Sequence, residues 1–378
     1  MIKRKLEPVI TNRLFKGKAI IVIGARQTGK TTLLREITSG FRSETLWLDA
    51  DDPVVKAQLT DANISALKLL TAGYKIVVID EAQQVKNIGK TLKLITDHIS
   101  DVQLMVSGSS ALELAEEISE PLTGRKFEYY LYPLSYEELS NHFGRLDELR
   151  MLEQRLIYGS YPDVVNSAST VKETLGLLAG SYLYKDIFKY QDLRKPDLLE
   201  QLLRALALQI GSQVSYHELG RLIGANIETV QRYIELLEKT YVIFRLRSFS
   251  RNFRNELKKS RKIYFYDNGI RNALINNYSP LDLRTDKGAL WENYLVSERI
   301  KYLHNNGLMA NRYFWRTQQQ QEVDYIEDID GVLHAYEFNW NSDAGSKLPL
   351  TFSNIYPNNV FKLVTSGNFD SFLKTEEP

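Results

Sequence analysis

Short apolar runs recur along residues 1–132 and alternate with segments of helical periodicity. The runs occupy residues 19–23, 45–49, 76–79, 103–108 and 127–132. A short apolar run bounded by polar turn residues predicts a strand buried on both faces, as a parallel sheet requires. Strands that alternate with helices predict an α/β fold with a doubly wound parallel sheet. We assign residues 1–140 to this core domain.

Helical periodicity dominates the next part of the chain, to about residue 195. Ser135 is placed to cap the first helix, acidic residues follow it, and residues 159–162 interrupt the pattern. The sequence Lys195-Pro-Asp then breaks the pattern cleanly. Residues 141–196 are therefore predicted to form a helical lid or connector.

Residues 197–262 follow the order helix, helix, turn, helix, strand. Ser215 opens the second helix with Glu218 three residues later, which is the pattern of a capping box. Residues 228–239 have helical spacing, and residues 241–247 alternate like a strand. This order predicts a winged helix-turn-helix.

The C-terminal part, residues 263–378, combines a predicted helix at 289–305 with strands at 312–316, 322–326 and 334–340. Glu292 lies on the helix, Asp324 on one strand and Glu337 on the next, which is the order of restriction-endonuclease-like folds. Those folds need a lysine at the position of Asn339, where it stabilises the attacking hydroxide. Asparagine carries no charge, so we predict a degenerate domain without metal-dependent cleavage.

The loop after the first strand fits G-x-x-x-x-G-K-[ST], the phosphate-binding loop. Its glycines allow N–H groups to turn onto phosphate oxygens, and the following helix N-terminus adds partial positive charge. Lys30 is expected to act on the β- and γ-phosphates, and Thr31 to ligate Mg²⁺. A strand-to-helix turn without a ligand is the alternative. The predicted ATP-binding residues are Gly24, Ala25, Arg26, Gln27, Thr28, Gly29, Lys30, Thr31, Thr32 and Ser107.

Two acidic residues, Asp80 and Glu81, end the apolar run at 76–79. Ligands of open α/β sheets bind at the carboxyl ends of the strands. Asp80 is predicted to hold Mg²⁺, and Glu81 to act as the general base that polarises the attacking water. An acidic helix cap is the alternative for this pair.

Ser107 and Arg125 are further candidates for contact with the γ-phosphate. Ser107 ends the run at 103–108, and Arg125 precedes the run at 127–132. Arg125 would supply a cation in cis or from a neighbouring subunit. The alternatives are a turn-forming serine and an ordinary surface arginine.

Charge and composition exclude several classes of protein. Lys and Arg total 48 against 47 Asp and Glu, so the net charge is +1 and there is no overall attraction to polyanions. Without cysteine, the chain has no disulfides, no thiolate nucleophile and no Cys-ligated metal. We find neither a secretory signal nor an apolar run long enough to span a bilayer. A cytoplasmic protein without a membrane partner is expected.

A local basic segment nevertheless follows the helix predicted at residues 228–239. Glu256 is the one acidic residue within this segment. Such a run is typical of phosphate contact and supports double-stranded DNA as a partner. The alternative is a winged helix that binds a protein partner or serves as a lid, with a solvated basic loop. The basic residues are Arg245, Arg247, Arg251, Arg254, Lys258, Lys259, Arg261 and Lys262, and the DNA-binding candidates are Gln231, Arg232, Arg251 and Arg254.

These motifs together resemble the AAA-type ATPases of bacteria and archaea that are described only as ATP-binding proteins. The resemblance lies in GARQTGKTTLL at 24–34, VVIDEAQ at 77–83, SGSS at 107–110, LTGR at 122–125 and PLSYEEL at 133–139. It continues through VSYHELGRLIG, KIYFYDNGIRNAL, GALWENY and YFWR…EVDY. The resemblance implies an AAA+ type core, a winged helix and a restriction-endonuclease-like domain. Family members usually have E-V-K where this chain has Glu337-Phe-Asn339.

The sequence hypothesis is a Mg²⁺-dependent ATPase that couples its nucleotide state to DNA or to a partner protein, which includes a homo-oligomer. Lys30, Glu81 and Arg125 are the predicted catalytic residues, and Thr31 and Asp80 the metal ligands. One alternative is a slow nucleotide-gated switch without significant turnover. The other is an ATP-regulated nuclease.

Overall fold

The structure is a computed structural model that describes residues 1–109, 118, 120–167, 169–182, 195–250 and 261–374. It consists of two compact units. The first comprises Met1–Pro133 with Lys239–Tyr241, and the second Leu134–Glu238 with Val242–Pro378. The predicted boundary at 140 falls close to the border between the units, whereas those at 196 and 262 lie inside the second unit.

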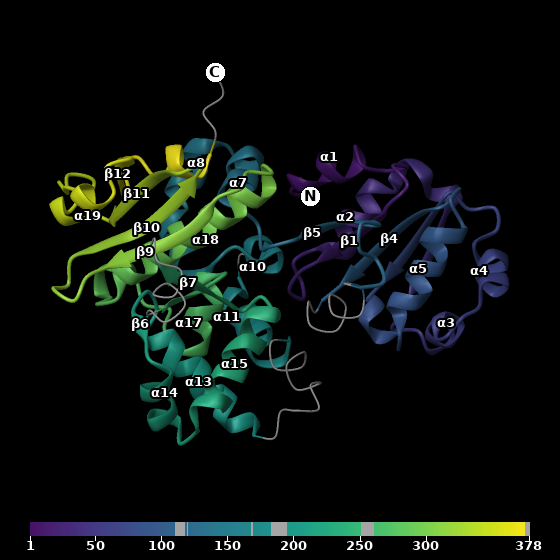
Figure 1. The fold of residues 1–378 in the computed structure, drawn as a ribbon, viewed down its shortest axis with the longest axis horizontal. Coiled ribbons are helices and arrows are strands. Elements are labelled where there is room, and N and C mark those ends of the chain that lie inside the picture. Colours follow the sequence, from purple (N-terminus) through teal and green to yellow (C-terminus); the bar gives the residue numbers. More distant parts are fainter. Residues whose placement is uncertain (110–117, 119, 168, 183–194, 251–260, 375–378) are drawn as a thin grey trace. The chain divides into compact units, whose positions relative to one another are not determined.

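A five-stranded sheet in the order β2-β3-β4-β1-β5 forms the centre of the first unit (Figure 1). All of its strand pairs are parallel, which confirms the predicted α/β fold with a parallel sheet. Strands β1, β3 and β4 are buried along their whole length, because their apolar runs face helices on both sides. The strands are β1 Ala19–Ile23, β2 Thr45–Asp49, β3 Ile76–Asp80, β4 Gln103–Gly108 and β5 Lys126–Tyr130.

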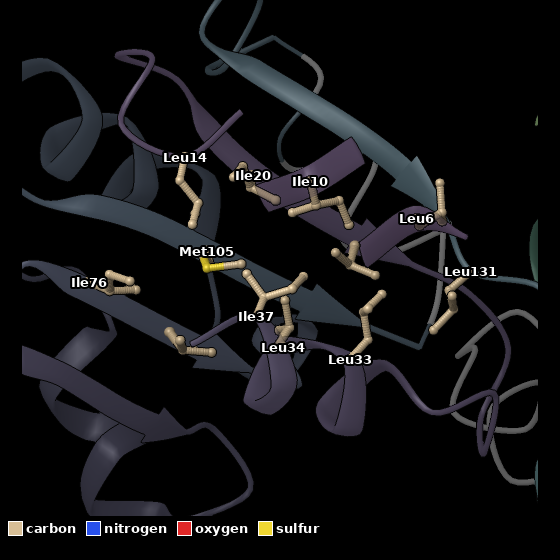
Figure 2. Packing of buried hydrophobic residues seen from close by; sticks show 12 residues of the cluster. Leu6, Ile10, Leu14, Ile20, Leu33, Leu34, Ile37, Ile76, Met105 and Leu131 are labelled. Atoms are coloured by element: carbon tan, nitrogen blue, oxygen red, sulfur yellow. The ribbon is translucent and has the colours of Figure 1, made fainter. Parts of the chain in front are cut away.

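Helices α1 and α2 share one hydrophobic cluster with the sheet. Leu6 and Ile10 of α1 pack with Leu33 and Leu34 of α2 above Met105 of β4, so the amphipathic start of the chain is part of the core (Figure 2). Of the described helices, none is both long enough and apolar enough to cross a bilayer. The helices of this unit include α1 Leu6–Thr11, α2 Lys30–Ile37, η1 Ser39–Glu44, α3 Pro53–Leu59, α4 Ile64–Thr71, η2 Ala82–Gln84 and α5 Ile88–His98.

The two glycines of the phosphate loop are required for different reasons. Gly29 has φ of 92°, a left-handed conformation that favours glycine. Gly24 instead lies against the backbone of β5's end, where a Cβ atom would be 2.2 Å from the Leu131 carbonyl oxygen. The Leu131 N–H donates to the Ile23 carbonyl at 2.7 Å, which fixes that approach. Gly24 is therefore a packing requirement of the sheet.

The second unit begins with helices, as predicted. Ser135 caps α7 in a capping box with Glu138, and the break predicted at 159–162 separates α9 from α10. The helices up to the undescribed segment 183–194 are α7 Tyr136–Phe143, α8 Arg145–Arg150, α9 Leu152–Tyr158, α10 Pro162–Asn166, α11 Val171–Leu177 and the π-helix η3 Leu178–Tyr182.

The next elements follow the predicted order, with one additional short strand. Strand β6 lies between the first two helices and pairs antiparallel with β8, which also pairs antiparallel with β7. The elements are α13 Pro196–Leu208, β6 Gln213–Val214, α14 Tyr216–Ile223, α15 Ile227–Lys239, β7 Ile243–Ser248 and β8 Arg261–Phe265.

These strands continue into the C-terminal part as a seven-stranded sheet in the order β12-β11-β10-β9-β7-β8-β6 (Figure 1). Strand β7 pairs parallel with β9 through Arg247 and Ser248. Residue 262 lies within β8, so a domain boundary there would cut through one hydrogen-bonded sheet. The remaining elements are α17 Asn268–Leu274, η4 Leu281–Leu283, α18 Lys287–Asn305, β9 Asn311–Arg316, β10 Glu322–Ile329, β11 Val332–Asn339, α19 Leu350–Ile355, β12 Asn359–Thr365 and α20 Asp370–Leu373.

The contact at Gly24 generates a stability prediction. Gly24→Ala should lower the free energy of unfolding by about 2 kcal/mol or more, because a backbone oxygen must move to admit the methyl group. Gly40→Ala is the matched control, since no atom of the described residues lies within 4 Å of its added Cβ. Urea unfolding of both variants measures the effect, and equal midpoints would contradict the packing requirement.

Candidate functional site

Side chains of the phosphate loop itself donate hydrogen bonds to two of the loop's carbonyl groups. Lys30 Nζ donates to the Gly24 and Ala25 carbonyl oxygens, both at 2.9 Å, and Thr28 Oγ1 donates to the Ala25 oxygen at 2.9 Å. In a trans peptide the N–H of the next residue points away from the carbonyl. The held carbonyls therefore turn the following N–H groups to the opposite side of the loop, where an anion would meet them.

The loop ends at the N-terminus of α2. Gly29 caps this helix without a side chain, so no side chain of the cap occupies the first N–H groups of the helix. Gln27 also has positive φ, of 59°, which closes the turn before Gly29. Thr31 and Thr32 lie in the first turn, and Arg26 is half-buried in the loop. The predicted binding residues thus form one continuous loop and helix start.

A hydrogen bond connects the loop to the end of β3. Thr31 Oγ1 donates to Asp80 Oδ2 at 2.8 Å, and Ser107 Oγ of β4 donates to the other oxygen, Oδ1. Asp80 is buried, with 5% of its surface exposed. The structure thus brings together both predicted Mg²⁺ ligands and Ser107. A hydroxyl and a carboxylate are oxygen ligands of the kind that Mg²⁺ prefers, so these residues fit that ion.

The predicted general base, Glu81, has an unusual backbone. Its φ of 52° and ψ of 41° are left-handed, a conformation that costs a non-glycine residue about 1–3 kcal/mol. The Glu81 N–H donates to Ser107 Oγ at 3.1 Å. Ser107 therefore contacts both acids of the motif, and its hydroxyl fixes the turn that follows β3.

Sequence reasoning missed Gln83, which contacts the Glu81 side chain. Gln83 Nε2 donates to Glu81 Oε2 and also to Ser109 Oγ, the latter at 2.9 Å. One carboxylate oxygen of Glu81 is thereby held against the tip of β4. The signal was present in the sequence, because Gln83 ends the segment VVIDEAQ.

Arg125 is not brought to the phosphate loop. It immediately precedes β5, and its carbonyl accepts from the Ala19 N–H at the start of β1. The loop follows the other end of β1, so Arg125 lies at the opposite edge of the sheet. Its side chain donates to Asp97 Oδ1 at 2.6 Å and is largely exposed. This placement agrees with the alternative of a surface arginine in this chain.

The DNA-binding candidates divide between described and undescribed residues. Gln231 and Arg232 are exposed on α15, where Gln231 Nε2 donates to Glu235 Oε1 at 3.1 Å. Arg251 and Arg254 lie outside the described residues, as do Lys258 and Lys259.

Two other members of the basic segment are not available to phosphate. Arg245 is bound to Glu238, and its Nη1 donates to Tyr216 Oη at 3.1 Å. Lys262 is buried, with 2% of its surface exposed. The exposed arginine of β7 is Arg247, and Arg261 lies over the Tyr216 ring at 5.1 Å.

Lys262 lies instead among the carboxylates of the C-terminal part. Its Nζ is 2.8 Å from Glu292 Oε1 and 2.5 Å from Glu322 Oε1. Tyr264 Oη donates to the same Glu292 oxygen at 2.6 Å. We call Lys262, Tyr264, Glu292, Glu322, Asp324 and Glu337 the charge cluster. A buried lysine from β8 thus lies among these carboxylates, whereas Asn339 is exposed at the end of β11.

Burial and repulsion between neighbouring carboxylates raise the pKa values of two carboxyl groups of the charge cluster, those of Asp324 and Glu337. Burial raises the pKa of Asp324 well above its ordinary value, and the charges of Glu292 and Glu337 add to this rise. Burial, then the charge of Glu322, raises the pKa of Glu337 to about 7. Burial by itself lowers the pKa of Lys262, but the surrounding carboxylates outweigh it and raise that pKa above its ordinary value. Among the described residues, no group of three or more acidic or histidine side chains is arranged to hold a metal ion.

The charge cluster generates a prediction about pH. Because the pKa of Glu337 is raised in the folded chain, the folded state keeps a proton that the unfolded state releases. The contribution of Glu337 to stability is therefore fully present below the ordinary glutamate pKa and is lost as pH rises through about 7. We expect the urea midpoint to decrease between pH 5 and pH 8, and Glu337→Gln to flatten this decrease. Glu153→Gln, on an exposed position of α9, is the control and should leave the slope unchanged.

Family models match three consecutive parts of the chain. Residues 16–140 match the model described as AAA domain. Residues 149–281 match a domain of unknown function (DUF8612), and residues 287–373 match another (DUF4143). The five-stranded parallel sheet and its loop are consistent with a P-loop AAA-like domain in the first of these parts.

Similar proteins of known sequence carry no described activity. An uncharacterized protein of Mycobacterium tuberculosis is 26% identical, over 86% of this chain and 70% of its own length. One of Methanocaldococcus jannaschii is 23% identical over 86% and 76%, and one of Haemophilus influenzae 26% identical over 83% and 80%. These relatives extend the similarity over both units without adding a function.

Similar solved structures are distant. Cdc6p from Pyrobaculum aerophilum is 12% identical over 72% of this chain and 92% of that chain, with a TM-score of 0.29. Pif1 helicase from Candida albicans is 15% identical over 47% and 48%, with a TM-score of 0.28. Scores this low support no argument from either protein. The match to the AAA domain, with the geometry of the loop, is what supports a P-loop AAA-type ATPase in residues 16–140.

Proposed function

We propose that the first unit binds ATP with Mg²⁺ and hydrolyses it. The observation that carries this proposal is the 2.8 Å hydrogen bond between Thr31 Oγ1 and Asp80 Oδ2. It joins the two sequence motifs, the phosphate loop and the acidic end of β3, at one point of the sheet edge. A loop that served only as a turn would have no need of a buried carboxylate beside its helix.

The loop residues bind the phosphates in this proposal. The N–H groups from Ala25 to Thr32 donate to phosphate oxygens, and Lys30 transfers its ammonium contacts from the loop carbonyls to the β- and γ-phosphates. Thr31 and Asp80 hold Mg²⁺. When bound, Mg²⁺ would supply positive charge that offsets the negative charge of the phosphates.

Glu81 orients the attacking water and accepts its proton. The Gln83 amide donates to one carboxylate oxygen, which leaves the other oxygen, Oε1, for the water. An amide does not titrate, so Gln83 fixes the direction of the carboxylate without neutralising it. The Ser107 hydroxyl stabilises the turn at Glu81, because it accepts a hydrogen bond from the Glu81 N–H.

Arg125 has no role in cis in this proposal. It lies at the edge of the sheet opposite the loop, beside Asp97. Arg125 could reach a nucleotide site only in a neighbouring subunit of a homo-oligomer. In that form the sequence prediction stays a prediction.

The ATPase proposal is tested by phosphate release. Lys30→Ala should abolish both ATP binding and release, because the loop loses its phosphate cation. Glu81→Gln should keep binding but slow release by about 10²-fold or more. Asp101→Asn, exposed on the loop before β4, is the control and should behave as the unmodified chain. ATP binding without release in every chain would favour the alternative, a slow nucleotide-gated switch.

We further propose that the segment from α13 to β8 is a winged helix that couples the nucleotide state to DNA. Three helices, a short strand and an antiparallel strand pair support this assignment. The phosphate contacts are assigned to the segment between β7 and β8, rather than to α15. The reason is charge, because α15 carries three acids, Glu228, Glu235 and Glu238, against Arg232 and Lys239.

DNA contact is tested by its dependence on salt. The double variant Arg251→Ala, Arg254→Ala should weaken binding to duplex DNA and reduce the slope of log affinity against log salt by about 2, because each arginine that neutralises one phosphate adds about 1 to that slope. Arg150→Ala, which removes an exposed arginine of α8, should change neither quantity. Binding that does not respond to salt, or no binding at low salt, would leave a protein partner as the alternative.

Metal-dependent DNA cleavage is not part of the proposal. The ammonium of Lys262 lies between Glu292 and Glu322, and Asn339 carries no charge at the position where the resembled family has a lysine. The charge cluster is therefore assigned a structural role.

A further inference from the structure

We propose that Arg4 is a positioning residue for the phosphate loop and that it connects this loop to the end of β5. The inference rests on the proposed nucleotide site and adds to it a residue that no motif contains. Arg4 precedes α1 and is separated from the loop by more than twenty residues of sequence.

The guanidinium of Arg4 holds two carbonyl groups at once. Nη1 donates to the Thr28 carbonyl at 2.7 Å, and Nη2 donates to the Tyr132 carbonyl at 2.6 Å. Hydrogen bonds from a charged donor are short and about twice as strong as neutral ones. Because the guanidinium is planar and rigid, the spacing of the two carbonyls is fixed by one side chain.

The bond to Thr28 determines the direction of one amide of the phosphate loop. The Thr28 carbonyl and the Gly29 N–H belong to the same trans peptide and point in opposite directions. While Arg4 holds the oxygen, the Gly29 N–H faces the other side, toward the proposed phosphate. A Cβ on Gly29 would lie 3.9 Å from Arg4 Nη1, so the guanidinium lies close to this peptide.

Loss of Arg4 would release this peptide. Glycine at position 29 gives the backbone freedom to rotate, and a rotated peptide would present the Thr28 oxygen to the phosphate. A carbonyl oxygen in that position repels an anion, whereas the N–H attracts it. The guanidinium thus favours the binding orientation without itself being in the loop.

The position of Arg4 is secured by the hydrophobic core. Leu6 and Ile10 of α1 are buried and pack with Leu33, Leu34 and Leu131 (Figure 2). The Glu7 N–H donates to the Arg4 carbonyl at 3.1 Å, so the turn that carries Arg4 leads directly into α1. A rigid helix, rather than a free chain end, therefore places the guanidinium.

The hydrogen bond from Arg4 to the Tyr132 carbonyl connects the phosphate loop to the segment that follows β5. Tyr132 follows Leu131, whose N–H pairs with the Ile23 carbonyl at the start of the loop. The strand that carries the loop and the segment that leaves β5 are therefore held by adjacent bonds. A nucleotide that binds the Gly29 N–H therefore acts on a peptide that is connected through Arg4 to the Tyr132 carbonyl.

Nucleotide affinity tests the positioning role on the full-length chain. The dissociation constant of a fluorescent ATP analogue with Mg²⁺ is measured for Arg4→Ala, Arg4→Lys and the control Lys3→Ala. Arg4→Ala should weaken binding about tenfold, or about 1.4 kcal/mol. Arg4→Lys should recover only part of this loss, because an ammonium cannot hold both carbonyls in the same fixed geometry. Lys3→Ala removes an exposed positive charge one residue away and should bind as the unmodified chain.

Hydrogen exchange separates positioning from a merely structural role. At saturating nucleotide, the unmodified chain should change its amide exchange in both the loop, residues 25–31, and the segment 128–132. Arg4→Lys should retain the change in the loop and lose it in the segment 128–132. If Arg4→Ala does not fold, as judged by thermal melting, Arg4→Lys serves for both measurements.

The outcomes separate the two proposals. Failure of the unmodified chain to bind the ATP analogue would overturn the proposed nucleotide site and this inference with it. Normal binding by the unmodified chain, with the same affinity in Arg4→Ala and Arg4→Lys, would overturn the inference alone. An equal exchange response at residues 128–132 in Arg4→Lys and the unmodified chain would overturn the connection to β5.

Discussion

The geometry of the proposed nucleotide site in the first unit depends on the Asp80 carboxylate, where the carboxyl ends of β1, β3 and β4 come together. One oxygen of this carboxylate accepts from Thr31 at the start of α2, and the other accepts from Ser107 at the end of β4. Strand β4 lies between β1 and β3, so Ser107 spans the gap that the strand order creates. A shift of any one strand along its neighbour would break one of these contacts. The register of the sheet is thus also the geometry of the site.

Residue pattern alone predicted most of this sheet, because β1, β3 and β4 are buried on both faces and read as continuous apolar runs. The loop was equally visible, since Gly24, Gly29 and Lys30 lie within seven consecutive residues at the spacing of the motif. Arg125 was a different case, and the sequence could have decided it. A residue before a parallel strand lies at the edge opposite to residues that follow one, so Arg125 and the loop could not share an edge.

Side chains that act across long sequence separations were not predictable. Lys262 belongs to a basic run, and a run of charges does not indicate which member turns inward. Its burial is possible only because α18 and β10 bring Glu292 and Glu322 to within ion-pair distance. A buried charge without such partners would cost several kcal/mol. The same limit applies to Arg4, whose acceptors are carbonyl groups that no residue type marks.

The strained turn at Glu81 connects these observations. A left-handed glutamate persists only where surrounding contacts determine it, and here Ser107 holds its N–H while Gln83 holds its carboxylate. Both contacts lead to the end of β4, whereas the loop is held from the other side by Arg4 and the end of β5. The loop also contacts the end of β4, because the Gly24 N–H donates to the Gly108 carbonyl at 3.3 Å. The end of β4 therefore supports both the proposed base and the phosphate loop, and Arg4 adds a second support to the loop alone.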